Sequence, residues 1–304
     1  MANKKIKKRI VWGDMIFYIG TLSIPVLFFI FNNFVINFNS LIMAFQKTNL
    51  DTGKLEFAGF ENFADVFSEV VTSKNLINAL WRSVWGYLVT LVVTTFIPVF
   101  FCYYVWKKMA FSNFFKVVLF LPTIISSIIT MTIYRFIANR LVPELCLDLF
   151  GTEILGLTSN PATSFQAVLF YNLWMSMGGG LLVTLGAMNA VDTEVLESGR
   201  LDGTNTITEF WYIVLPSIYR IIFIGFIAGI VSIFTADYGL YGFYGSAADP
   251  ETWTLGYYFT KMTLEATEVE LPFYAAWGII VSVIVIPVTL FFRDLIYNHG
   301  PSED

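Results

Sequence analysis

Residues 194–216, EVLESGRLDGTNTITEFWYIVLP, form a charged stretch between two long apolar segments. A polar hairpin between membrane spans does not need this order of acids, glycines and a final Leu-Pro, so we infer that the stretch has a binding partner. Asp192 is a candidate N-cap, and Glu194 lies in the first turn, where the helix dipole favours an acid. Gly203 is a natural stop. The stretch predicts a short helix of about three turns.

A second helix is predicted to begin at Thr206, because Thr206 and Glu209 have the spacing of a capping box. This helix leads into the next apolar segment, and Pro216, which has no amide hydrogen, should kink or restart it. The two helices form a helix-turn-helix at one membrane face. Gly199 costs about 1 kcal/mol relative to alanine in a helix, but it keeps that side of the helix small enough for close approach to another surface.

The composition is that of an integral membrane protein. Hydrophobic residues make up 56% of the chain and charged residues 13%, whereas soluble domains carry about 25% charged residues. The net charge of -5 is not concentrated in a basic stripe, so nucleic acid is not an expected partner. Cys102 and Cys146 fall on opposite sides of the membrane and are not expected to pair. The chain has no nucleotide-binding or metal motif, and its only histidine is His299, so neither catalytic residues nor a metal site are expected.

Six apolar segments are long enough to cross a hydrocarbon core of about 30 Å. They are residues 15–37, 79–106, 114–137, 165–187, 211–236 and 273–297. The predicted fold is therefore all-α, a polytopic membrane protein with six transmembrane helices. Residues 1–14 form a basic N-terminal segment, 15–297 the transmembrane domain and 298–304 the tail. The first segment lacks a small-residue cleavage site and is interpreted as a retained anchor.

Lysine and arginine beside the spans predict the orientation. They cluster at residues 4–9 and again at Lys107, Lys108 and Lys116, which places both termini in the cytoplasm. The loops at 46–78 and 138–163, and the acidic loop at 237–272, then face outward. The stretch at 194–216 falls inside the cell, in the loop 188–210.

This stretch closely resembles the cytoplasmic "EAA" loop of bacterial ATP-binding-cassette importer permeases. The family pattern is Glu-Ala-Ala, then Asp-Gly-Ala, then Ile-x-Leu-Pro. The matching residues here are Glu197-Ser198-Gly199, Asp202-Gly203-Thr204, and Ile213 with Leu215-Pro216. Residues 59–63 and 121–122 also resemble elements of this family, and Trp174, Asp237 and residues 254–258 fit its sugar-importer branch, so the resemblance covers nearly the whole chain. Residues 245–250 and Arg82-Ser83 depart from its usual Gly-Gly-Pro and Asn-Thr.

The resemblance implies that the chain is a sugar-importing permease subunit in a bacterial cell membrane and is not itself an enzyme. A separate ATPase subunit would use ATP and Mg. It would bind the loop through Glu197, Ser198, Gly199, Asp202 and Gly203. The implied partners are a second homologous permease, two ATP-binding subunits, an extracytoplasmic solute-binding protein, the lipid bilayer and a carbohydrate substrate. The alternative is that the acids of the loop only keep it hydrated.

A candidate solute path follows from polar groups within the spans. Asn172, Ser176 and Gly179 recur at helical spacing on one face, and in the family residues on this span and the next contact the sugar. Ser232 and Asp237 complete the candidate set. The alternatives are that the stripe packs helices through small residues and that Asp237 lies in water at the membrane boundary. Residues 178–180, three glycines, would permit a close crossing or a pivot.

Other functions stay open at this point. A permease for an anionic solute such as a glycerol phosphate should need cationic residues at mid-span, whereas Arg82 and Arg135 lie nearer the outer ends of their spans. A secondary transporter should show ion-coupling residues at mid-depth and inverted repeats. A membrane enzyme should show a nucleophile or a metal-ligand set. The residues display neither the ion-coupling groups and repeats nor the nucleophile or metal-ligand set.

Overall fold

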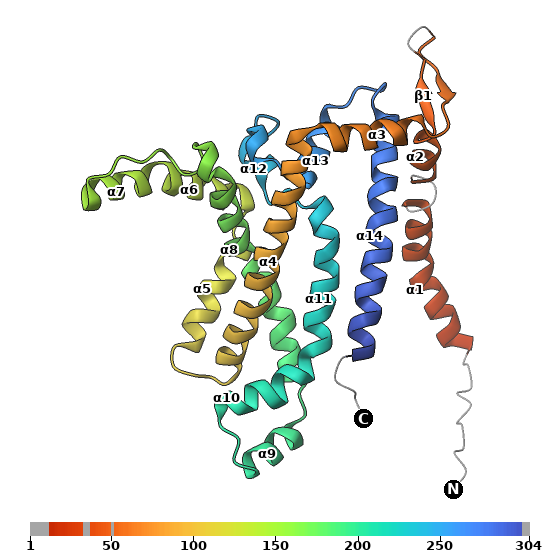
Figure 1. Ribbon diagram of the computed structural model, residues 1–304. Coiled ribbons are helices and arrows are strands. Elements are labelled where there is room, and N and C mark those ends of the chain that lie inside the picture. Colours follow the sequence, from red (N-terminus) through yellow and green to blue (C-terminus); the bar gives the residue numbers. More distant parts are fainter. Residues whose placement is uncertain (1–11, 33–36, 50–51, 300–304) are drawn as a thin grey trace. The chain divides into compact units, whose positions relative to one another are not determined.

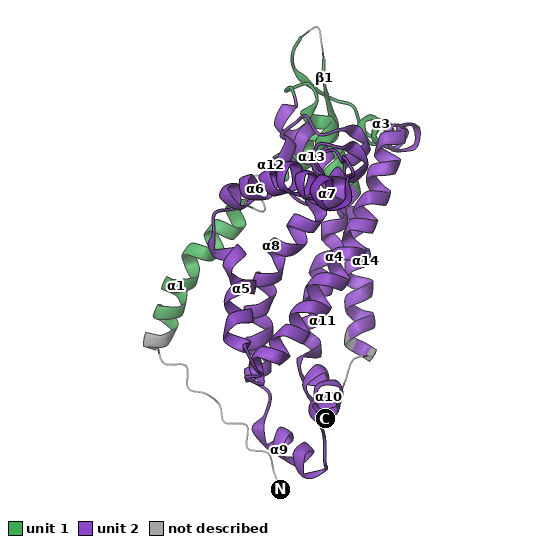
Figure 2. Cartoon of the chain, turned by 90° about the vertical axis from the view of Figure 1, so that its left-hand side faces the viewer, with its two compact units in different colours: residues 1–66, 267–280 green, residues 67–266, 281–304 purple. Residues whose placement is uncertain are grey.

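The computed structural model describes residues 12–32, 37–49 and 52–299 (Figure 1). Most of the predicted basic N-terminal segment and most of the tail lie outside the described residues. The chain divides into two compact units, shown in different colours in Figure 2. Unit 1 comprises residues 1–66 and 267–280, and unit 2 comprises residues 67–266 and 281–304. The predicted transmembrane domain, 15–297, therefore runs through both units.

Unit 1 contains two helices, a small hairpin and the first parts of two further helices, one of which is α14 (Leu271–His299), described below. Its elements are α1 (Trp12–Ile30), α2 (Asn37–Met43), β1 (Gln46–Thr48), β2 (Leu55–Phe57) and the first residues of α3 (Glu61–Thr72). The strands pair antiparallel, with Lys47 opposite Glu56. The sequence predicts only a loop over residues 46–78, so the hairpin and α3 are additions to that prediction.

Asn62 holds this hairpin in place. Its side chain is buried, and its Nδ2 donates to the carbonyl oxygens of Ala44 at 2.9 Å and Gln46 at 2.7 Å. Lys47 binds Asp65 at 2.8 Å and Glu61 at 3.2 Å. The hydrogen bond to Asp65, followed by the one to Glu61, raises the pKa of Lys47. The family-like element at residues 59–63 thus has a structural role in ordering the hairpin.

Unit 2 is a bundle built on four longer helices. The helices α4 (Lys74–Trp106) and α8 (Pro161–Asn189) pack along each other, α11 (Leu215–Thr235) packs on α4, and α5 (Ser112–Ile124) packs on α8. The remaining elements are α6 (Ser127–Phe136), η2 (Ile137–Leu141), α7 (Val142–Phe150), α9 (Thr193–Leu201), α10 (Thr206–Glu209), η3 (Phe210–Val214), α12 (Leu240–Tyr244), η4 (Pro250–Thr252) and α13 (Leu255–Glu265). Helix α14 (Leu271–His299) begins in unit 1 and continues in unit 2. Figure 1 shows α9 and α10 at one end of this bundle and α12 and α13 at the other.

The membrane-spanning helical fold is confirmed. Among the described residues, four segments are long and apolar enough to cross a membrane: Lys74–Trp106, Pro161–Asn189, Tyr219–Tyr244 and Leu271–Ile296. Such helices suit a bilayer because they satisfy their backbone polar groups internally. The predicted first span corresponds to a shorter apolar helix, Phe17–Ile30. Part of its predicted range, residues 33–36, lies outside the described residues.

The predicted third span, 114–137, is divided between two helices, and it counts as a fifth span among the described residues only if the pair is taken together. It is broken between α5 and α6, and the two parts are bent by 104°. Ile125 and Ser126 have extended backbones, and Pro122, which has no amide hydrogen, weakens the last turn of α5. Tyr171 of α8 fixes the new direction, because its hydroxyl donates to the Ser127 carbonyl oxygen at 3.1 Å. The break lies within continuous apolar sequence, so hydropathy does not mark it.

The predicted outer loop at 138–163 contains η2 and α7, and the loop at 237–272 contains α12, η4 and α13. Cys146 accordingly lies in α7, while Cys102 is buried in α4. Both cysteines are free, as predicted. Helix α8 begins earlier than predicted because Asn160 caps it, accepting from the Ala162 amide at 3.1 Å, and Pro161 occupies its first turn.

Candidate functional site

Helix α9 carries the first element of the sequence motif. Asp192 caps it, with its Oδ1 accepting from the Glu194 amide at 2.9 Å. The helix ends at Leu201, and Gly203 follows with a φ of 84°, a conformation that glycine adopts without strain. The predicted start and stop are therefore confirmed. The helix has 9 residues, slightly fewer than the three turns predicted.

One face of α9 is packed against the bundle. Leu196 is buried in a cluster with Val99 and Phe210, which attaches the helix to α4 and η3. Gly199 is also buried, and a Cβ at this position would overlap Cδ1 of Ile213. The first and third elements of the motif thus touch within this chain. The close approach inferred from Gly199 is an approach to the chain's own Ile213.

The opposite face of α9 is open. Glu197, Ser198, Asp202 and Gly203 are exposed, and Leu201 is 89% exposed. The Ser198 hydroxyl donates to the carbonyl oxygen of Val195 at 3.0 Å, a bond within the helix. Of the five residues assigned to the loop from the sequence, four therefore lie at the surface and one, Gly199, faces inward.

The capping box predicted at Thr206 and Glu209 is wrong by one position. Asn205 is the N-cap, and its Oδ1 accepts from the amides of Ile207 at 3.0 Å and Thr208 at 2.9 Å. Thr208 completes the box, because its Oγ1 accepts from the Asn205 amide at 2.8 Å. Glu209 takes no part in the capping box, and its side chain is buried.

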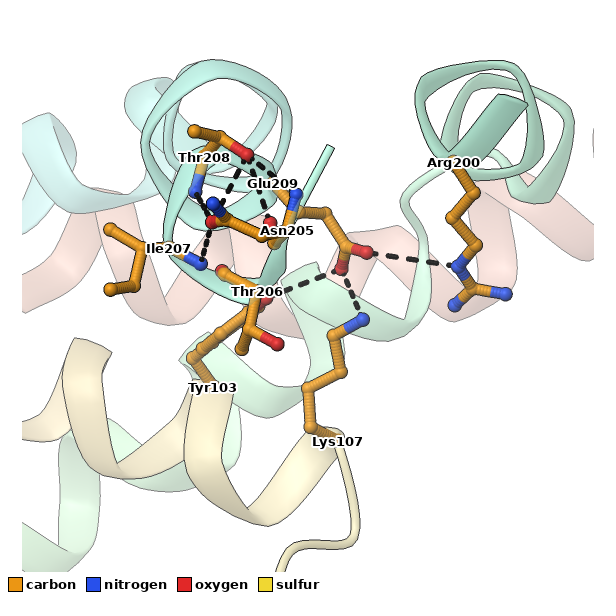
Figure 3. Close-up of polar contacts among 8 residues, drawn as sticks. All are labelled: Tyr103, Lys107, Arg200, Asn205, Thr206, Ile207, Thr208 and Glu209. Carbon is orange, nitrogen blue, oxygen red and sulfur yellow. Dashed lines mark hydrogen bonds and ion pairs between the residues drawn. The ribbon is translucent and has the colours of Figure 1, made fainter. Parts of the chain in front are cut away.

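Glu209 is the residue that sequence reasoning missed. Figure 3 shows its carboxylate among side chains from α4 and α9. Lys107, directly after α4, places Nζ 2.5 Å from Oε1, and Arg200 of α9 places Nε 3.7 Å from Oε2. The Tyr103 hydroxyl donates to the Thr206 carbonyl oxygen at 2.8 Å and lies 3.3 Å from Oε1 of Glu209. The side chain of Glu209 is only 3% exposed.

The loop enters the membrane helix through a π-helical segment, η3. The amide of Leu215 donates to the Phe210 carbonyl oxygen, five residues back, and the regular helix restarts there with Pro216 in its first turn. The proline has no amide to donate to the preceding turn. The prediction that Pro216 restarts the helix is confirmed.

A cavity of about 430 Å³ lies among α4, α8 and α11. Ser232, a predicted path residue, lines it, and its Oγ donates to the Gly229 carbonyl oxygen at 2.5 Å. Hydroxyl-bearing residues also line the cavity from α4 and α8: Tyr87, Thr90, Thr94, Thr95 and Thr184. Of the described residues that line it, none is charged.

The other predicted path residues lie elsewhere. Asn172, Ser176 and Gly179 share one partly open face of α8 and are not part of the cavity lining. Val183, which does line it, follows Ser176 by seven residues, or about two turns. The face of Asn172, Ser176 and Gly179 therefore leads to the rim of the cavity.

Asp237 has a local structural role. Its carboxylate accepts from the amides of Gly239 at 3.0 Å and Tyr241 at 3.2 Å, and so starts α12. Among the three glycines, the close crossing is at Gly178, where a Cβ would lie 2.7 Å from the Leu119 carbonyl oxygen. A Cβ at Gly179 would meet no atom of the described chain within 4 Å.

Comparison with known proteins identifies the class. Residues 103–298 match the model of the binding-protein-dependent transport system inner membrane component family. Because this match covers more than half of the chain, the protein belongs to that family, and its motif-bearing loop lies inside the matched region.

Two relatives from Bacillus subtilis (strain 168) are transport permeases. The chain is 26% identical over 215 residues to the arabinooligosaccharides transport system permease protein AraP, an alignment that covers 67% of this chain and 66% of the relative. It is 24% identical over 256 residues to the galactooligosaccharides transport system permease protein GanP, covering 79% and 60%. The aligned part spans less than two thirds of the length of either relative.

The fold is also that of a solved transporter. A crystal structure of a bacterial ABC transporter involved in the import of the acidic polysaccharide alginate matches with a TM-score of 0.74 and 18% identity, covering 95% of this chain and 99% of that one. The alginate transporter in complex with an alginate pentasaccharide-bound periplasmic protein matches with a TM-score of 0.73 and 17% identity, covering 94% and 96%.

Proposed function

We propose that this chain is the permease subunit of an ATP-driven importer that translocates a sugar, of oligosaccharide size, across a bacterial cell membrane. The observation that carries the proposal is α9. Its inner face is fixed to the bundle through Leu196 and Gly199, while Glu197 and Leu201 are exposed at the end of the bundle. A helix held so firmly on one side and left open on the other is suited to contact a separate protein. We call α9 the coupling helix.

The partner at the coupling helix is an ATP-binding subunit, present in two copies, which uses ATP and Mg²⁺ while this chain binds neither. Glu197 pairs with a basic residue of that subunit. Ser198, Asp202 and Gly203 form the rest of the contact, and Gly199 contributes by letting the helix lie close to Ile213. The turn between α4 and α5 lies at the same end of the bundle as α9 (Figure 1), and its sequence includes Lys107 and Lys108. Basic residues beside spans mark the cytoplasmic side, which supports a cytoplasmic position for the loop. The basic residues at 4–9 support the same side for the N-terminus, and we propose it for the C-terminus as well.

The substrate proposal is supported by two observations. The relatives AraP and GanP are named for arabinooligosaccharides and galactooligosaccharides. The cavity near Ser232 has hydroxyl-bearing side chains and, among the described lining residues, no charge. A neutral, hydroxyl-rich solute suits this lining better than an anion such as a glycerol phosphate, which needs cationic partners.

The remaining partners follow from open surfaces and from family membership. Ser176 and Gly179 face outward from α8, so a second homologous permease can complete the path between the two chains, with Asn172 on the same face. An extracytoplasmic solute-binding protein delivers the sugar, as the family description implies. The similar alginate transporter was solved with its periplasmic protein bound.

The test begins with copurification of this permease with an ATPase, followed by reconstitution in liposomes. Replacing Glu197 by lysine should lower both uptake and substrate-stimulated ATP hydrolysis, because it reverses the charge at the contact, while membrane insertion persists. The matched control is Glu144→Lys, which reverses an exposed acid on α7. Equal activity of Glu197→Lys and Glu144→Lys would refute the coupling role, and uptake by the permease without any ATPase would refute the proposed function.

A further inference from the structure

Glu209 is a buried acid that the proposed coupling contact does not use. Its carboxylate lies where three segments meet: the end of α4, the coupling helix α9 and the short helix α10 (Figure 3). Lys107 binds it at 2.5 Å from the α4 side, and Arg200 approaches it at 3.7 Å from the α9 side. One carboxylate therefore connects the coupling helix to a membrane-spanning helix.

The two cations are held differently. Lys107 is 19% exposed, and its Nζ also lies over the rings of Tyr103 at 5.8 Å and Trp106 at 5.7 Å. Arg200 is 58% exposed and makes the longer contact. Glu209 is therefore bound firmly to α4, while its connection to α9 is the looser and more accessible one.

Stability alone is a weak explanation for such a cluster. Removing a carboxylate and an ammonium group from water costs about as much free energy as their mutual attraction gains. Replacing a buried ion pair by well-packed apolar residues therefore often leaves the stability unchanged or higher. The best-attested use of a buried ion pair is to fix the register of two elements. Here the ion pairs of Glu209 fix the positions of α9, α10 and the end of α4 relative to one another.

Helix α4 extends from this cluster to the cavity. It contributes Tyr87, Thr90, Thr94 and Val99 to the cavity lining. A displacement of α9 that is passed to the end of α4 therefore reaches the residues around the solute path. Energetic coupling between distant sites requires a physical connection of this kind or a shared equilibrium between two states.

We propose that Glu209 is a positioning residue that links the coupling helix to α4 through Arg200 and Lys107, so that movement of α9 by the ATPase is converted into movement of α4. This inference rests on the proposed function. It assigns to Glu209 a role in the efficiency of coupling, separate from the contact that Glu197 makes with the ATPase.

The experiment uses the complete importer in proteoliposomes and measures solute uptake and ATP hydrolysis separately. Glu209→Gln keeps the shape of the side chain and removes its charge, so the amount of solute moved per ATP hydrolysed should fall by about 5-fold or more, within the usual range of coupling energies. Glu144→Gln, which neutralises an exposed acid of α7 outside both the cluster and the coupling helix, should leave this ratio unchanged.

Arg200→Gln provides a second variant, because an exposed side chain can be replaced without loss of the fold. It should lower the same ratio, while the yield and melting temperature of the complex stay close to wild type. An unchanged ratio in both Glu209→Gln and Arg200→Gln would overturn the proposal, as would a lower yield or melting temperature with a normal ratio. Failure of the proposed function looks different: the wild-type complex then shows no ATP-driven uptake, which overturns both.

Discussion

Two neighbouring glycines of α8 should respond in opposite ways to the same substitution. A Cβ at Gly178 would lie 2.7 Å from the carbonyl oxygen of Leu119 and would overlap Cγ2 of Thr123, both on α5. Ordinary contact begins at about 3.5 Å, and the backbone oxygen cannot turn aside, so α5 and α8 must separate. A Cβ at Gly179 meets nothing within 4 Å in the described chain.

The magnitudes can be worked out for each variant. Both substitutions by alanine gain about 1 kcal/mol of helix propensity. Gly178→Ala also pays about 1–3 kcal/mol for overpacking, so its net effect runs from neutral to about 2 kcal/mol destabilising. Gly179→Ala should stabilise by about 1 kcal/mol. Because the propensity gain is common to both, the difference between the variants, about 1–3 kcal/mol, isolates the α5–α8 contact.

The assay is thermal unfolding of the purified permease in one detergent. A difference of 1 kcal/mol corresponds to about 2–4 °C in domains of roughly 200 residues, so Gly178→Ala should melt several degrees below Gly179→Ala. Equal melting temperatures, or a less stable Gly179→Ala, would refute the assignment of the close crossing to Gly178. Either result would also favour the face of α8 with Asn172, Ser176 and Gly179 as the one that packs against a neighbouring helix.

Two further predictions concern side chains that hold backbone groups. Asn205→Ala should destabilise the start of α10 by about 1 kcal/mol, and faster hydrogen exchange at the capped amides of Ile207 and Thr208 would show it; unchanged exchange would contradict the cap. Asn62→Leu should cost about 1–3 kcal/mol, because the buried carbonyl oxygen of Ala44 and the partly buried one of Gln46 lose their donor. Limited proteolysis should then cut the hairpin sooner, and wild-type resistance would argue against the Asn62 contacts.

The spans and the ends of α9 could be predicted from the sequence because their causes are local. Long apolar runs must be helical in a bilayer, and Asp192 and Gly203 act on amides and turns within a few residues. The restart at Pro216 is local in the same way. The predicted Thr206–Glu209 box failed because Asn205 and Thr208 satisfy the same spacing one residue earlier. Spacing alone does not choose between two overlapping caps.

The remaining features depend on contacts between distant residues. Hydropathy continues across Ile125 and Ser126, so the bend there is visible only once Tyr171 is seen to hold α6. Glu209 and Lys107 are separated by about a hundred positions, and neither is unusual in its own neighbourhood. Their pairing is a property of the folded bundle. Only two signals in the sequence could have suggested the pairing: the basic turn that follows residue 106, and the acid at the end of the loop 188–210.

The contact between Gly199 and Ile213 restricts how this loop can be exchanged with those of other permeases. The family pattern has alanine where this chain has Gly199, and that methyl group would meet Cδ1 of Ile213. The same pattern has isoleucine at the position of Ile213, so in a donor the alanine and the isoleucine are held apart by the backbone between them. A chimera that receives only residues 194–203 must displace Cδ1 of its own Ile213, whereas one that receives residues 194–216 brings both side chains with the backbone that separates them. Recombination between importers should therefore preserve the two halves of the loop as a single inherited block.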